Sequence, residues 1–279
     1  MDKRLLVAVF IMGIFCIASF SGCVSQPSQP DKIDGMSAKE VLDKSFAASA
    51  AADTYSYNMT MRASLPNNVS GGVAMDVMSV LGRVDKVNKK MYLSTVMNQL
   101  QPAQNTEAYI IGSTYYGRLA SGEWVKQEST NDNLWQQSSI QGMQGELANY
   151  STVGFLPEEK VGGVDCYVLN ITPDKDKLPS LLGKNANLPE QTLSNIVSAS
   201  IKEWVAKDSF LMQRILFQID MEDSGKIIRM ETEIVFFDYG KNQSIELPEG
   251  AMNAKTLEQQ TSKKPTEEEI KQLEEGTRV

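Results

Sequence analysis

Residues 54–61 of the chain read Thr54-Tyr55-Ser56-Tyr57-Asn58-Met59-Thr60-Met61. A large apolar side chain occupies every second position of this segment, and a polar side chain occupies each position between them. Alternation with a period of two is typical of a β-strand that buries one face and exposes the other to water. The segment therefore predicts a strand of an antiparallel sheet with one covered face.

Strand-like segments recur along the rest of the chain. They cover residues 73–81, 90–96, 108–111, 114–119, 123–127, 165–172, 201–206, 211–221 and 227–239. Short turn sequences such as Gly112-Ser113 and Ser224-Gly225 separate several of them. Successive strands joined by short turns pair as antiparallel neighbours. The segments therefore predict one large antiparallel sheet.

Helical patterns occur at three places. Ser37 and Glu40 form a capping box, and an amphipathic stretch continues from them to Ala52. Residues 131–150 and 188–200 also carry apolar side chains at helical spacing. The predicted fold class is α+β, with a curved antiparallel β-sheet whose apolar face is covered by a few helices.

The N-terminus is predicted to be an export signal. Lys3 and Arg4 precede an apolar run, Leu5–Phe20, that is shorter than a membrane-spanning helix needs. The sequence Phe20-Ser21-Gly22-Cys23 is similar to the lipobox of prokaryotic lipoproteins, in which the cysteine becomes the lipidated first residue. Residues 1–22 are thus interpreted as a signal peptide and Cys23 as a lipid anchor, or the segment is an uncleaved signal anchor. Both interpretations place the rest of the chain outside the cytoplasm and tied to the cell membrane.

The remaining chain divides into three regions. Residues 23–36 hold the anchor and a Ser/Gln/Pro-rich stretch that is predicted to be a flexible spacer. Residues 37–252 form the folded domain, and residues 253–279 form a charged tail that is either a short helix or disordered. Cys166 is then the single thiol of the domain, because Cys16 leaves with the signal peptide. We expect it to be a small buried side chain without a disulfide.

Composition excludes several classes of chemistry. The 279 residues include no His and three Cys, and the formal net charge is −8. A Ser-His-Asp or Cys-His site and a histidine-ligated metal are therefore excluded, and the acidic balance argues against nucleic acid as a partner. The sequence also contains no phosphate-loop, dinucleotide-binding or nucleophile-elbow motif. We predict no catalytic residue, no metal and no cofactor.

Five N-x-[ST] sequences are candidate glycosylation sites. Their acceptors are Asn58, Asn68, Asn149, Asn170 and Asn242. The alternative is chance occurrence in a chain rich in Asn, Ser and Thr.

Four motifs in this order resemble the LolA/LolB-like family of lipoprotein carriers, including the LppX/LprG-type lipid-binding lipoproteins. They are the capped helix followed by 54–61, the hairpin 108–126 that ends in a Trp, the strand 161–169, and the closing segments 203–208, 237–240 and 245–251. The resemblance implies a half-barrel of antiparallel strands with helices over its concave apolar face. It also implies a binding role, because the family carries no enzymatic residues.

The implied site is the apolar face of the half-barrel, which would bind a lipid, an acyl chain or another hydrophobic ligand. Methionine, of which the chain has 14, suits a surface that repacks around varied apolar partners. The candidate lining residues are Tyr55, Tyr57, Met59, Met61, Met91, Leu93, Tyr109, Ile111, Trp124, Ile215, Phe217 and Ile219, and the candidate gating residues of the covering helices are Phe46, Met143 and Leu147.

The predicted function is a membrane-tethered, non-enzymatic carrier or sensor of a hydrophobic ligand. One alternative is a structural or interaction module of the cell envelope, whose half-barrel is filled by its own side chains and whose partner is an envelope protein. A hydrolase that uses two carboxylates is a third interpretation, which would need two buried carboxylates in one cleft.

Overall fold

The computed structural model describes residues 30–64, 74–98, 103–128, 149–174, 177, 195–223 and 225–256. The predicted signal peptide, Cys23, Asn68, Met143 and Leu147 lie outside these residues, as does most of the predicted helix 131–150. Residues from Asp31 onward form one compact unit. This unit contains all the helices and strands that are described.

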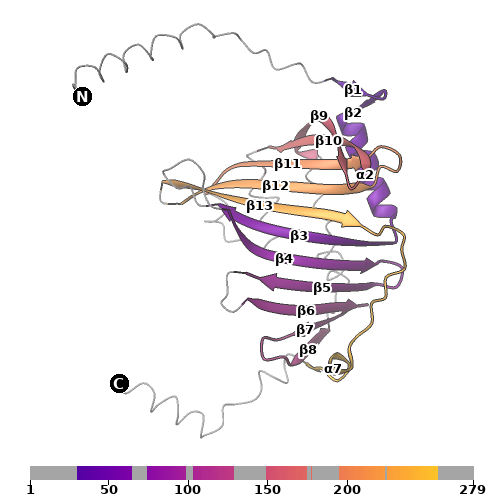
Figure 1. The fold of residues 1–279 in the computed structure, drawn as a ribbon, viewed down its shortest axis with the longest axis vertical. Coiled ribbons are helices and arrows are strands. Elements are labelled where there is room, and N and C mark those ends of the chain that lie inside the picture. Colours follow the sequence, from indigo (N-terminus) through magenta and orange to yellow (C-terminus); the bar gives the residue numbers. More distant parts are fainter. Residues whose placement is uncertain are drawn as a thin grey trace, which may run out of the picture. The chain divides into compact units, whose positions relative to one another are not determined.

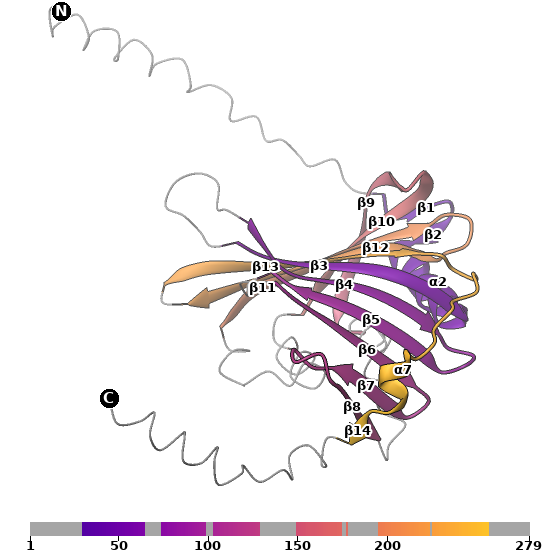
Figure 2. The ribbon, with the colours of Figure 1, turned by 60° about the horizontal axis from the view of Figure 1, so that its bottom comes forward.

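Most of the unit is a single sheet. Its strands are β3 (Thr54–Ser64), β4 (Ala74–Asp85), β5 (Lys90–Met97), β6 (Gln104–Ile111), β7 (Thr114–Arg118), β8 (Trp124–Glu128), β9 (Ser151–Val161), β10 (Val164–Pro173), β11 (Ile196–Ala206), β12 (Met212–Asp223), β13 (Lys226–Phe237) and β14 (Lys255–Thr256). Within the described residues these twelve strands follow the order β14-β8-β7-β6-β5-β4-β3-β13-β12-β11-β10-β9. All neighbours are antiparallel except β14, which is parallel to β8. The sheet is visibly curved (Figures 1 and 2).

A short hairpin and one long helix precede β3. The hairpin consists of β1 (Lys32–Ile33) and β2 (Met36–Ser37), and α2 (Ala38–Ala51) follows it directly. The predicted flexible spacer 23–36 is therefore wrong from Lys32 onward, because Ile33 and Met36 pack against the core. The predicted capping box is confirmed, because the Ser37 hydroxyl accepts from the Glu40 amide and the Glu40 carboxylate accepts from the Ser37 amide, 2.8 Å away. At the other end Lys86 donates to the carbonyls of Ser49 and Ala50, which satisfies two of the last carbonyls of the helix.

The predicted antiparallel sheet with few helices is confirmed. α2 contacts β9, β10, β11 and β12 and lies at one end of these strands (Figure 1). A second helix, α7 (Glu249–Met252), is a single turn beside β7 and β8. The two-residue strand β14 extends the sheet four residues beyond the predicted domain end at residue 252.

One predicted helix is wrong in its C-terminal part. The spacing of Ile196 and Val197 suggests a helix that ends at Ser200, whereas residues 196–206 form β11. In β11, Ile196 pairs with Met221 and Ser198 with Asp220, so the backbone hydrogen bonds of this segment go to β12. Val197 is 39% exposed, as expected for the outward position of a strand. Short apolar spacing does not distinguish helix from strand when a neighbouring strand supplies partners.

Candidate functional site

The two faces of the sheet differ in character. Tyr55, Tyr57, Met59 and Met61 alternate along β3, so they lie on one side of the sheet. Leu42 of α2 belongs to the same apolar cluster as the two tyrosines. We call this side the α2 face and the other side the opposite face.

The α2 face is filled where α2 packs on it. Tyr55 and Tyr57 are 4% and 7% exposed, and Leu42 is fully buried. The ring of Tyr57 lies over Gly82, its partner on β4, since a Cβ at that glycine would come within 2.2 Å of the ring. Burial raises the pKa of the Tyr57 hydroxyl to about 12. This part of the face is therefore a packed core.

The same face is half-exposed at the other end of the strands. Here the apolar side chains belong to residues farther from α2 along each strand, and we call this set the methionine-rich end. It consists of Met61, Met78, Met97, Met230, Phe217 and Ile219. Met97 is 40% exposed and the others are partly exposed. Flexible, polarizable side chains at a partly open surface can repack around an apolar ligand.

A buried carboxyl group lies between α2 and the sheet. Glu203 of β11 is 2% exposed, and its side chain accepts a hydrogen bond from the hydroxyl of Ser45 of α2 at 2.7 Å. Burial raises the pKa of Glu203 from its usual value of 4.5 to about 7, although the bond from Ser45 opposes the shift. Its neighbours in register are apolar, Leu169 on β10 and Ile215 on β12. Glu203 is not among the predicted site residues. Its alternation with the apolar residues Ile201 and Val205 is nevertheless a sequence signal for a buried position.

The structure divides the predicted lining residues into three groups. Tyr55, Tyr57, Met91 and Ile215 are buried in the core beneath α2. Met59, Leu93 and Phe217 are half-buried and pack against that core, while Met61 and Ile219 lie beyond it on the same face.

The third group, Tyr109, Ile111 and Trp124, lies on the opposite face. Met91 pairs with Ile110, so the even-numbered residues of β6 share the α2 face with Met91. Likewise Val125, which pairs with Gly117, lies on the α2 face, and Trp124 points the other way. Placing these three residues in the lining is therefore wrong. A shift of register by one residue moves every side chain of a strand to the other face.

Of the predicted gating residues, Phe46 is described. It is partly buried and packs against the core cluster from α2. The candidate glycosylation acceptors Asn58, Asn149, Asn170 and Asn242 are exposed. Cys166 is fully buried in a small cluster on the opposite face with Val168 and Trp204, and burial raises the pKa of its thiol.

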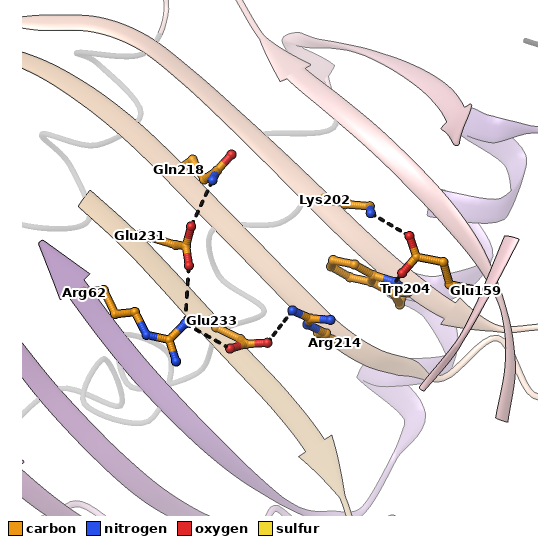
Figure 3. A network of polar contacts seen from close by, with 8 residues as sticks. All are labelled: Arg62, Glu159, Lys202, Trp204, Arg214, Gln218, Glu231 and Glu233. Atoms are coloured by element: carbon orange, nitrogen blue, oxygen red, sulfur yellow. Dashed lines mark hydrogen bonds and ion pairs between the residues drawn. The ribbon is translucent and has the colours of Figure 1, made fainter. Parts of the chain in front are cut away.

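Charged side chains join strands across the opposite face (Figure 3). Arg62 of β3 pairs with Glu231 and Glu233 of β13, and Glu233 pairs in turn with Arg214 of β12 at 2.6 Å. Gln218 donates to Glu231 at 2.9 Å. Networks of this kind on a partly exposed surface hold the strands in register.

A second group on this face surrounds Trp204 (Figure 3). Its indole nitrogen donates to Glu159 at 2.8 Å, and Lys202 pairs with the same carboxylate at 2.8 Å. The charged ends of Lys202 and Arg214 lie 4.6 and 4.4 Å from the ring of Trp204. The hydrogen bond and ion pair with Lys202, followed by the bond from Trp204, hold the pKa of Glu159 below its usual range.

Two properties of the described residues bear on other functions. They hold no cluster of three or more His, Cys, Asp or Glu side chains arranged to bind a metal ion. None of the described helices has the length and apolar character required to cross a membrane.

Comparisons with known proteins agree with this architecture. The family described as "Family of unknown function (DUF6612)" matches residues 37–256. No curated protein has a significantly similar sequence. Among solved structures, LprF from Mycobacterium bovis is similar with a TM-score of 0.50 and 15% identity, over 76% of this chain and 96% of LprF.

Two further structures are less similar in shape. The lipoprotein LppX from Mycobacterium tuberculosis has a TM-score of 0.45 and 11% identity, over 75% of this chain and 97% of LppX. A LolA superfamily protein from Nitrosomonas europaea has a TM-score of 0.27 and 13% identity, over 76% of this chain and 96% of its own. The similarity to LprF establishes a shared fold, so the predicted resemblance to the LolA/LolB-like carriers is confirmed at the level of the fold.

Proposed function

Since this chain belongs to DUF6612, a family of unknown function, we propose from its geometry that it binds a hydrophobic ligand on the α2 face. The ligand is a lipid or an acyl chain, and the protein is an extracytoplasmic lipoprotein anchored through Cys23. The chemistry is carriage or sensing without catalysis. The observation that carries the proposal is the half-exposed methionine-rich end, which continues directly from the packed core beneath α2.

The character of the face supports an apolar ligand. Along β12 and β13 the α2 face presents Phe217, Ile219 and Met230, while the charged partners Arg214, Asp220 and Glu231 lie on the opposite face. An acyl chain that lies on Phe217, Ile219 and Met230 therefore contacts apolar side chains, and the charged position of this face on β13, Lys226, stands at the start of that strand. Each CH₂ group that it removes from water contributes about 0.8 kcal/mol.

In this proposal α2 and the helix predicted at 131–150 cover the α2 face, and Phe46, Met143 and Leu147 gate access to the ligand. The side chains packed beneath α2 hold this helix in place, and the helix would have to shift to admit a ligand beneath it. The segment between Cys23 and the hairpin that begins at Lys32 would keep the domain close to the membrane from which a lipid would come. The four candidate acceptors that the structure describes are exposed, and two of them, Asn58 and Asn170, lie on the opposite face of the sheet.

The second candidate function is a structural or interaction module of the cell envelope. The fully packed half of the α2 face favours it, because Tyr55, Met91 and Ile215 leave no room for a ligand beneath α2. The charged network of the opposite face would then contact an envelope protein. Ligand binding at the methionine-rich end distinguishes the two functions.

Met61→Lys is expected to lower the affinity for a fluorescent C16 fatty acid by at least tenfold. Met61 is partly exposed and lies outside the core cluster, so the substitution should leave the fold intact while placing a charge where the acyl chain must be desolvated. Equilibrium titration of the delipidated protein measures the effect.

The matched control is Thr60→Lys, which adds the same charge to the neighbouring residue of β3 on the opposite face. It should bind the fatty acid as the unmodified protein does. Equal losses in the two variants, or no loss in either, would contradict binding on the α2 face.

A further inference from the structure

A small pocket lies on the opposite face, between the sheet and the segment that follows β13. Its volume is about 210 Å³, and Leu81, Arg83, Tyr92, Tyr109, Ser244, Ile245 and Glu246 line it. The segment 238–248 leads from β13 to α7 along the strand ends (Figures 1 and 2). Ile245 is 3% exposed, so this segment is packed onto the sheet and forms a fixed wall. The volume is that of a ligand smaller than a lipid.

Aromatic rings form one side of the pocket. The ring centres of Tyr92 and Tyr109 are 5.0 Å apart, and those of Tyr109 and Trp124 are 5.8 Å apart. The hydroxyl of Tyr92 donates to Glu107 at 3.2 Å, and the indole of Trp124 lies against α7, where a Cβ at Gly250 would be 3.1 Å away. The rings are therefore held from both ends, and they present a preformed apolar surface with polar edges.

Arg83 supplies the positive charge of the pocket. The structure describes five arginines, and four of them, Arg62, Arg118, Arg214 and Arg229, form ion pairs with carboxylates. Within the described residues Arg83 has no such pair. Its guanidinium lies 5.7 Å from the ring centre of Tyr92 and its side chain is exposed. Its donors are thus available for a bidentate bond to a ligand carboxylate.

Glu246 supplies a negative charge in the same pocket. It lines the pocket from the segment 238–248, and among the described contacts it forms no ion pair with Arg83. The pocket thus has one positive and one negative group that do not neutralise each other, next to the faces of tyrosine rings. This arrangement matches a ligand that carries both charges. A carboxylate would bind Arg83, and an ammonium group would bind Glu246 and the faces of the rings.

We propose that this pocket binds a zwitterionic amino acid or the equivalent small ammonium carboxylate, with its side chain against Leu81, Ile245 and the tyrosine rings. The site is separate from the α2 face, because Arg83, Tyr92 and Tyr109 point to the opposite side of the sheet. It therefore neither depends on lipid binding nor competes with it.

The test is isothermal titration of the purified mature chain with three probes. These are leucine, N-acetyl-leucine, which lacks the ammonium group, and leucinamide, which lacks the carboxylate. Leucine should bind, and each of the other probes should bind at least tenfold more weakly. If leucine fails to bind at millimolar concentration, or if all three probes bind equally, the proposal is wrong.

Two variants assign the charges to residues. Arg83→Met should abolish leucine binding, whereas Arg229→Met, which removes an arginine paired with Asp220 from the same face, should leave it unchanged. The Glu246→Gln variant should bind leucine and N-acetyl-leucine with equal affinity. Unchanged leucine binding by the Arg83→Met variant would overturn the assignment. Fatty acid binding by the same variant serves as the control that its α2 face is intact.

Discussion

Leu42→Ala lowers the free energy of unfolding by about 2–5 kcal/mol, the cost of truncating a buried leucine where the surroundings relax little. The Leu42 side chain is fully buried within α2 and joins the helix to the cluster that contains Tyr55 and Tyr57. Because that cluster continues across β3, β4, β5 and β6, the cavity would weaken the whole domain. Urea denaturation of the mature chain measures the change.

The control for this prediction is Asp43→Ala, on the next residue of the same helix. Asp43 is exposed and pairs with Lys39 at 2.9 Å, an i,i+4 contact that contributes about 0.3–0.5 kcal/mol. If Leu42→Ala lowers the free energy of unfolding by no more than Asp43→Ala does, α2 does not cover the sheet as described.

Glu203→Gln stabilises the domain increasingly as the pH rises from about 4.5 to 7. The pKa of Glu203 is higher in the folded state, about 7, than its usual value of 4.5, so the folded state binds the proton more tightly. Stability attributable to Glu203 is thus complete below pH 4.5 and is lost as the pH rises through 7. Gln keeps the shape and the acceptor for Ser45 but carries no charge.

The expected gain from Glu203→Gln is near zero at pH 4 and roughly 3 kcal/mol at pH 8. The groups that face Glu203 are Ser45 from α2 and Tyr239 after β13, and neither is charged in this range. Carboxyls with lowered pKa values, such as Asp220 beside Arg229, affect both proteins equally and cancel in the difference. The measurement is urea denaturation of both proteins at several pH values.

Glu123→Gln, which alters an exposed carboxylate, should show no such trend. A difference between Glu203→Gln and the unmodified protein that does not change from pH 4 to pH 8 would contradict a buried, protonated Glu203. The prediction also bears on ligand entry, because ionising this residue weakens the contact between α2 and the sheet on which any gating by α2 depends.

The sequence predicts this fold well where the pattern is local. The alternation at 54–61 identifies both β3 and its buried face, and the capping box locates the start of α2. Ile215, Phe217 and Ile219 share a face in the structure, as their spacing predicts. These features depend on backbone geometry within one segment, which a single sequence contains.

The errors arise where a neighbouring strand decides the outcome. Tyr109 and Ile111 alternate as a lining strand would, but the pairing of Met91 with Ile110 turns them to the opposite face. Residues 196–200 have helical spacing and become β11 because β12 lies beside them. The alternation of Glu203 with Ile201 and Val205 indicates its buried position, but the sequence does not indicate its partner Ser45, which is 158 residues away along the chain. Register and long-range partners are not contained in local periodicity.

The most direct test of hydrophobic ligand binding on the α2 face is an NMR titration of the delipidated mature chain, labelled with ¹³C at the methionine methyl groups. Palmitate is the ligand, and single Met→Leu variants assign the signals. Met61, Met78, Met97 and Met230 should shift together, whereas Met252 of α7, which is 63% exposed, should not. Signals of the methionine-rich end that stay fixed at saturating palmitate, or shifts confined to Met252, would contradict the proposed function.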